Sequence, residues 1–374
     1  MRTRKQYRLI VLLLLITVLL TGSAAKADEP DSTNESTGQK TETATEIPQI
    51  SEEGTVVILA TGGTIAGVGE TGKETGYTPG SISVESLISA VPDLEKIANI
   101  AAIQICNVNS DDITSEIWIQ LANTINELAQ NENVSGFVIT HGTDTMEETA
   151  YFLNMVVKTD KPVVLTGSMR PSTAISADGP MNLYQAVCVA ASEKGAGKGV
   201  QVVFSDRIFS ARSVRKISTY DVMAISAGES GCIGVIRNNE VIYYEEPVQK
   251  HTTATEFDVN NVSALPSVQI VYFAVDADPG LLTYAAEHAD GLVIAGAGAG
   301  EFSEGFKAII NELKIPVVIS SRINDGIITQ DAVLCENTVA ANDLPAQKAA
   351  ILLRLAIMNN TAAKDELIRI FETY

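Results

Sequence analysis

Short apolar runs alternate with helical patterns along most of the chain. Five runs have the length of a buried strand, at residues 56–60, 100–105, 137–140, 163–165 and 202–205. Between the second and third runs, Ile117, Leu121, Ile125 and Leu128 recur at the spacing of one helix face. Strands that alternate with helices form a mostly parallel sheet covered on both faces. The pattern therefore predicts an α/β fold.

The alternation is interrupted once, and this interruption divides the chain. Residues 244–266 are mostly polar, and strand runs then resume at 268–275, 291–295 and 316–320, each of which we expect a helix to follow. Before the interruption, Thr145 and Glu148 have the spacing of a capping box at the start of a helix. We predict two α/β domains with mostly parallel sheets, a larger N-terminal catalytic domain at 54–243 and a smaller C-terminal domain at 267–374, joined by a linker at 244–266.

The first 53 residues show neither pattern. Four basic residues near the start precede an apolar run at 9–20 and an A-x-A cleavage site at 25–27 (AKA), the order typical of a signal peptide. The run of twelve residues is shorter than the about 20 that a membrane-spanning helix needs. We predict a signal peptide at 1–27, a disordered polar leader at 28–53, and export to the periplasm or the medium. Ser23 stands where a lipoprotein would have its acylated cysteine, so we expect no membrane association after cleavage.

Composition excludes several classes of function. The formal net charge is −20, which disfavours nucleic acid and anionic membranes as partners because both are also negative. The four cysteines lie far apart without a CxxC pair, and the three histidines are equally dispersed, so neither a metal site nor a disulfide framework is indicated. We predict an enzyme that uses no metal and no cofactor, with free thiols.

Hydroxyl-rich loops follow the first four predicted strands. They lie at residues 61–64 (TGGT), 107–111 (NVNSD), 141–145 (HGTDT) and 166–171 (TGSMRP). In an open parallel sheet, ligands bind at the carboxyl ends of the strands, which share one edge. Glycines in these loops allow backbone N–H groups to approach a ligand. We therefore expect the functional site at this edge.

The residues at this edge argue against two common chemistries. Residues 67–72 fit G-x-G-x-x-G, but no strand ends directly before them and no apolar helix follows, so the nucleotide-binding context is missing. A serine hydrolase needs a histidine base, and the chain has no G-x-S-x-G elbow and only His141 near a candidate loop. A threonine nucleophile can instead be activated by a lysine or a tyrosine. Tyr77, thirteen residues beyond Thr64, and Lys216, after the fifth predicted strand, are candidates.

Two of the loop segments carry a family resemblance. Residues 61–67 (TGGTIAG) and 139–150 (ITHGTDTMEETA) resemble the two signature segments of bacterial L-asparaginases, and together with the signal peptide they resemble the exported type II branch. Further similar blocks lie at 161–164, 169–172 and 176–180. The resemblance extends from about residue 54 to the last residue. It implies hydrolysis of the side-chain amide of L-asparagine to L-aspartate and ammonia.

The resemblance gives catalytic roles to five residues. Thr64 would be the nucleophile that forms an acyl-enzyme ester, with Tyr77 on a flexible loop as its partner. Thr143, Asp144 and Lys216 would form the second catalytic group. Lys216 would take a proton if its pKa were lowered, or stabilise negative charge, and Asp144 would balance the cation. Which threonine acts first stays open.

The resemblance also implies how the substrate is held. Ser110, Asp111 and Asp144 would bind the α-carboxylate and α-amino groups. Backbone N–H groups in the loops of Thr143 and Ser168 are candidate donors to the oxyanion that develops on the amide. The family fold further implies that a neighbouring subunit completes each site, in a homotetramer.

Three positions depart from the family pattern. Asp111 stands where glutamine is frequent, Ala299 where asparagine or serine is frequent, and Val333 where an acid is common. These changes leave open the contacts to the substrate amino group and the preference between asparagine and glutamine. A glutaminase-asparaginase that accepts both amides is therefore an alternative, and an exported amino-acid-binding protein is another. A binding protein would not need two threonines and a lysine together.

Overall fold

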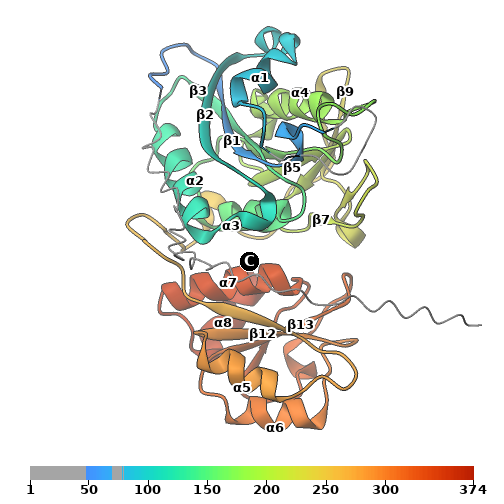
Figure 1. The fold of residues 1–374 in the computed structure, drawn as a ribbon. Coiled ribbons are helices and arrows are strands. Elements are labelled where there is room, and N and C mark those ends of the chain that lie inside the picture. The colour runs from blue at the N-terminus through green and yellow to red at the C-terminus, as the bar shows by residue number, and fades with distance from the viewer. Residues whose placement is uncertain (1–47, 70–77, 79) are drawn as a thin grey trace, which may run out of the picture. The chain divides into compact units, whose positions relative to one another are not determined.

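The computed structural model describes residues 48–69, 78 and 80–374 (Figure 1). The predicted signal peptide, most of the predicted leader and Tyr77 lie outside the described residues.

The larger sheet has eight strands among the described residues, in the order β10-β9-β6-β5-β4-β3-β1-β2. Its parallel strands are β1 (Thr55–Gly62), β2 (Asn99–Val108), β3 (Val134–Thr140), β4 (Val163–Thr166) and β5 (Val200–Phe204). Antiparallel strands extend it, namely β6 (Arg207–Ser210), β9 (Gly234–Arg237) and β10 (Glu240–Tyr243). A separate pair consists of β7 (Arg215–Lys216) and β8 (Ile225–Ser226).

Helices cover both faces of this sheet, as Figure 1 shows. They are α1 (Val84–Ser89) and α4 (Gly179–Ala190) on one face, and α2 (Ser115–Leu128) and α3 (Met146–Val156) on the other. Alternate residues of β1 belong to the two resulting cores: Val57 and Leu59 pack with α2 and α3, and Val56 and Ile58 with α1 and α4. This is why β1 is continuously apolar from Val56 to Ala60 rather than alternating.

The smaller sheet is entirely parallel, in the order β11-β12-β13-β14. Its strands are β11 (Val268–Tyr272), β12 (Gly291–Gly296), β13 (Val317–Ser321) and β14 (Thr338–Ala340). Its helices are α5 (Gly280–Glu287), α6 (Glu304–Glu312), α7 (Ala346–Met358) and α8 (Lys364–Thr373). Residues of α7 share one hydrophobic core with α3, so α7 is buried between elements of the two sheets. The two sheets confirm the predicted α/β fold class.

Short 3₁₀ helices complete the chain: η1 (Thr64–Ala66), η2 (Pro92–Lys96), η3 (Ser110–Asp112), η4 (Glu193–Gly195), η5 (Gly228–Ser230), η6 (Thr252–Ala254) and η7 (Gln330–Ala332). The segment at 244–266 contains η6 and two fully buried side chains, Phe257 and Val259. This connection therefore contributes to the core.

Three local predictions need correction. Thr145 stands at the N-cap of α3, but its hydroxyl donates to Ser110 O (2.6 Å), so it forms no capping box with Glu148. β13 is followed by η7 and β14 rather than by an α-helix. Lys216 does not follow β5 directly, because β6 intervenes and runs back beside it.

Two further observations concern the cysteines and the helices. All four cysteines are free thiols, with Cys188 and Cys335 buried and Cys106 and Cys232 half-buried. In the part of the chain that the structure describes, no helix has both the length and the apolar character needed to cross a membrane.

Candidate active site

The carboxyl ends of the parallel strands bring the predicted loops together. Gly62 of β1 lies beside Val108 of β2, and Ala60 lies beside Thr140 of β3. Thr140 in turn lies beside Thr166 of β4. The four loops therefore leave the sheet at one edge, where ligands of such sheets bind.

Two glycines allow three of these loops to touch. Gly63 has a φ of +78°, and a Cβ there would lie 2.3 Å from Gly142 N. A Cβ on Gly142 would lie 2.8 Å from Ser110 Oγ. Since no side chain fits at either point, the contact depends on glycine. Thr64 and Thr143 directly follow these glycines, so the same contact holds the two threonines on adjacent loops.

The hydroxyl residues around this contact are shielded from water. Thr64 is 7 %, Ser110 3 % and Thr143 5 % exposed. Thr64 begins η1 and Ser110 begins η3, so the chain turns directly after β1 and directly after β2. Electrostatic interactions are stronger where water is excluded, which suits chemistry on a hydroxyl.

Lys216 joins this group through its ammonium. Its Nζ donates to Thr143 Oγ1 at 2.8 Å and to Asp144 Oδ1 at 2.5 Å. The Lys216 side chain is 17 % exposed and that of Asp144 is 66 % exposed. A cation beside the Thr143 hydroxyl stabilises any negative charge that develops on its oxygen.

The backbone of Lys216 is fixed as well. Its N–H donates to Glu147 Oε2 at 2.6 Å, and the other oxygen of this buried carboxylate accepts from Gln347 Nε2 at 2.5 Å. Glu147 belongs to α3 and Gln347 to α7. Hydrogen bonds therefore fix both the backbone N–H and the side-chain ammonium of Lys216.

His141 has a structural role instead. It is fully buried, and burial lowers its pKa to about 4, so the imidazole is neutral at pH 7. Its Nδ1 lies 2.7 Å from Gly142 O, which requires the proton on Nδ1. Nε2 then accepts from the Thr149 hydroxyl (2.9 Å), whose oxygen accepts from Trp118 Nε1 (2.8 Å). With both ring nitrogens engaged, His141 is no candidate for the base.

The other predicted site residues differ in their surroundings. Asp111 is exposed, within η3. Ser168 is fully buried at the same sheet edge, but its hydroxyl donates to Arg170 O at 2.8 Å within its own loop. Tyr77 lies outside the described residues. The structure thus brings Ser110, Thr64, Thr143 and Lys216 together around the contact of Gly63 with Gly142. Asp111 lies on the exposed side of this group.

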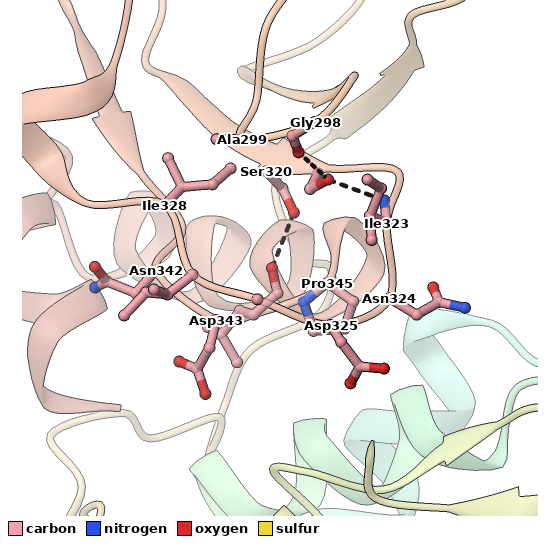
Figure 2. Close-up of a pocket in the computed structure, with 14 residues that line it drawn as sticks. Gly298, Ala299, Ser320, Ile323, Asn324, Asp325, Ile328, Asn342, Asp343 and Pro345 are labelled. Carbon is pink, nitrogen blue, oxygen red and sulfur yellow. Dashed lines mark hydrogen bonds between the residues drawn. The ribbon is translucent and has the colours of Figure 1, made fainter. Parts of the chain in front are cut away.

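Two cavities lie at the edges of the two sheets. An open cleft of about 630 Å³ is lined by Asp144, Glu147 and Lys216. A cavity of about 200 Å³ lies beyond the carboxyl ends of β12 and β13, and Figure 2 shows the residues that line it. Ala299 is among them, whereas Val333 follows η7 and packs beside the apolar core of the smaller sheet.

Within the described ranges, no group of three or more histidine, cysteine, aspartate or glutamate side chains is placed to hold a metal ion. Three residues that act on the Lys216 segment are not part of the sequence prediction: Glu147, Gln347 and Lys348. Lys348 alone has a weak signal in the sequence, because this charged residue directly precedes the apolar run at 349–353 of α7.

Two family models together cover most of the chain. Residues 55–249 match the N-terminal domain of asparaginase, and residues 267–371 match the glutaminase/asparaginase C-terminal domain. The chain belongs to the asparaginase family. Members of this family are hydrolases that act on amides, and this confirms the resemblance carried by the loops around Thr64 and Thr143.

Individual relatives agree with this assignment. The chain is 43 % identical to L-asparaginase 2 of Escherichia coli over 85 % of this chain and 93 % of that protein. It is 44 % identical to a Haemophilus influenzae protein named probable L-asparaginase periplasmic, over 83 % of this chain and 89 % of that protein. The crystal structure of probable cytoplasmic L-asparaginase from Campylobacter jejuni has a TM-score of 0.82 at 42 % identity, covering 87 % of this chain and 100 % of that one.

Proposed function

We propose that the protein is an exported L-asparaginase that converts L-asparagine and water to L-aspartate and ammonia through an ester on Thr64. One observation carries the proposal. Lys216 Nζ binds both Thr143 Oγ1 (2.8 Å) and Asp144 Oδ1 (2.5 Å). Thr143 and Asp144 belong to the loop in which Gly142 makes close contact with Gly63, the residue before Thr64. A buried nucleophile candidate beside a polarised second hydroxyl is the arrangement that amide hydrolysis needs.

The proposed reaction has two steps. Thr64 Oγ attacks the side-chain amide carbon of asparagine, the C–N bond breaks, and the hydroxyl proton leaves with the nitrogen as ammonia. Water then adds to the ester, the C–Oγ bond breaks, and the Thr64 hydroxyl is restored as L-aspartate departs. Tyr77 and the group of Thr143, Asp144 and Lys216 assist the proton transfers.

The substrate is held by polar groups at the same edge. The Ser110 hydroxyl donates a hydrogen bond to the α-carboxylate, and Asp111 and Asp144 bind the α-ammonium. Backbone N–H groups of the Thr143 and Ser168 loops stabilise the oxyanion. Asp144 is largely exposed in a single chain, which is consistent with a neighbouring subunit that covers the site in a homotetramer.

A glutaminase-asparaginase is the second candidate function. It is favoured by the family model for residues 267–371, which carries both names. A binding protein is disfavoured because ligand binding alone does not require the Lys216 ammonium on the Thr143 hydroxyl.

Export is proposed from the leader pattern, with support from the name of the Haemophilus influenzae relative. Intact-mass analysis of the secreted protein tests this proposal. A first residue near Asp28 without an added acyl mass is expected, and retention of residues 1–27 would contradict it.

Ammonia release from asparagine and from glutamine under identical conditions tests the activity. We expect rapid release from asparagine by the wild-type protein and at least a 10³-fold loss in Thr64→Ala. Equal rates for the two amides would favour the second candidate. No release from either amide by folded protein would refute both.

A further inference from the structure

The segment that carries Lys216 lies outside the larger sheet. β6 is antiparallel to β5, and its last residue, Ser210, lies beside Gln201 near the amino end of β5. Thr143, by contrast, follows the carboxyl end of β3. Residues 211–214 must therefore return toward the carboxyl edge outside any named strand, before Arg215 and Lys216 pair with β8 in a ladder of only two residues.

Lys348 of α7 supplies hydrogen bonds to this segment. Its side chain is fully buried, and its Nζ lies 2.9 Å from Ala211 O, 2.9 Å from Arg212 O and 2.5 Å from Val214 O. An ammonium has three hydrogens, so each carbonyl accepts one. Lys348 Nζ also lies over the ring of Tyr151, 5.9 Å from its centroid.

The charge of Lys348 is compensated at this position. Burial lowers its pKa to about 7, and the Glu147 carboxylate opposes this shift. A neutral amine would have only two hydrogens and would turn its lone pair toward a carbonyl oxygen, so the three acceptors favour the ammonium. A buried charge is costly unless it is fully hydrogen-bonded, as it is here.

The residue before Lys348 acts on the same segment from a second direction. Gln347 binds one oxygen of Glu147, and the other oxygen accepts from the backbone N–H of Lys216. Two consecutive residues of α7 thus hold the segment that places the Lys216 ammonium on Thr143.

We propose that Lys348 and Gln347 are positioning residues for Lys216, through which α7 fixes the distance from Lys216 Nζ to Thr143 Oγ1. This inference rests on the proposed catalytic role of Lys216. A shift of about 1 Å at a reacting group can lower a rate about 100-fold. Loss of Lys348 or Gln347 should therefore lower kcat rather than raise KM.

Two variants and one control test the proposal in the full-length mature enzyme. Lys348→Met should lower kcat for asparagine by roughly 10- to 100-fold with little change in KM, and Gln347→Leu should lower it by a smaller factor. The control is Lys158→Met. Lys158 Nζ also binds backbone carbonyls, those of Thr252 (3.2 Å) and Thr255 (3.0 Å), in a part of the chain outside the site. This variant should retain its kcat.

A double-mutant cycle separates positioning from general stability. In a Lys216→Met background, adding Lys348→Met or Gln347→Leu should cause no further loss of kcat, because Lys348 and Gln347 act through Lys216. Additive losses, or a wild-type kcat in folded Lys348→Met, would overturn the proposal. Should Lys348→Met fail to fold, the cycle with the half-buried Gln347 decides in the same way.

These variants also separate the catalytic role of Lys216 from its positioning by α7. Full activity in Lys216→Met would refute the proposed role of Lys216. A strong loss in Lys216→Met with no effect of either α7 variant would leave that role intact and refute only the positioning by α7.

Discussion

The ammonium of Lys216 donates to the hydroxyl of Thr143 across 2.8 Å, although 73 positions separate the two residues in the sequence. Thr143 lies on a loop at the carboxyl end of β3, and Lys216 lies on a segment held by α3 and α7. The contact therefore depends on elements from both sheets. It defines where negative charge on a threonine oxygen would be stabilised.

Loss of the Lys216 ammonium should remove this stabilisation. We expect Lys216→Met to lower kcat by about 10³-fold, in the range of a lost acid–base or electrostatic group. Lys216→Arg keeps the charge but cannot lose a proton, so it separates the two roles. Recovery of at least a tenth of wild-type turnover by arginine would assign Lys216 an electrostatic role, whereas an inactive arginine variant would favour proton transfer.

Asp111 should contribute modestly to substrate affinity. Its side chain is exposed in a single chain, and exposed ion pairs contribute about 0.2–1 kcal/mol, so we expect Asp111→Asn to raise KM for asparagine by no more than about fivefold. Asp112→Asn, the same change at the neighbouring exposed position, is the matched control. Equal KM values for the two variants and the wild type would remove Asp111 from the binding site.

The contact of Gly63 with Gly142 should be essential. Gly63→Ala places a Cβ 2.3 Å from Gly142 N and should separate the loops of the two threonines, lowering kcat by roughly 100-fold or more. Gly54→Ala is the control, since Gly54 has nearly the same φ (+74°) but nothing within 4 Å of an added Cβ. Gly63 also has a ψ of −172°, a combination with positive φ that is essentially confined to glycine, so backbone strain adds to the clash, and only Gly63→Ala should lose activity. Similar kinetics for the two would show that the close approach is unimportant.

Buried His141 should make stability depend on pH. Its pKa is lowered from 6.5 to about 4 in the folded state, so between these values the unfolded chain binds more protons. This contribution to stability is complete above pH 6.5 and is lost as the pH falls toward 4, by about 3 kcal/mol in total. His141→Gln should be less dependent on pH in this window, as measured by urea unfolding at pH 7, 6 and 5. The other titratable groups contribute equally to both proteins. An identical dependence of the free energy of unfolding on pH in the wild type and in His141→Gln would therefore contradict the lowered pKa of His141.

The sequence predicts most of the parallel strands because an apolar run reflects burial on both faces, as in β1 and β3. It does not reveal β6, β9, β10 and β14, which are three or four residues long and lack a distinctive run. The capping box fails because the Thr145 hydroxyl has a tertiary partner, Ser110 O, that local spacing cannot show.

The site is predictable to a similar extent. Loops at strand ends, and the family resemblance of their residues, identify Thr64, Ser110 and Thr143. The residues that hold Lys216 in place, Glu147 and Lys348, contact it or its segment only through tertiary packing. No spacing along the chain encodes those contacts.

Identification of the acylated residue tests the central proposal most directly. The enzyme is mixed with asparagine, quenched in acid within the first turnovers, digested, and analysed by mass spectrometry. We predict an aspartyl adduct on the peptide that contains Thr64 in the wild-type protein, and no adduct in Thr64→Ala. An adduct on Thr143 instead, or a folded Thr64→Ala that keeps a tenth of wild-type turnover, would contradict Thr64 as the nucleophile.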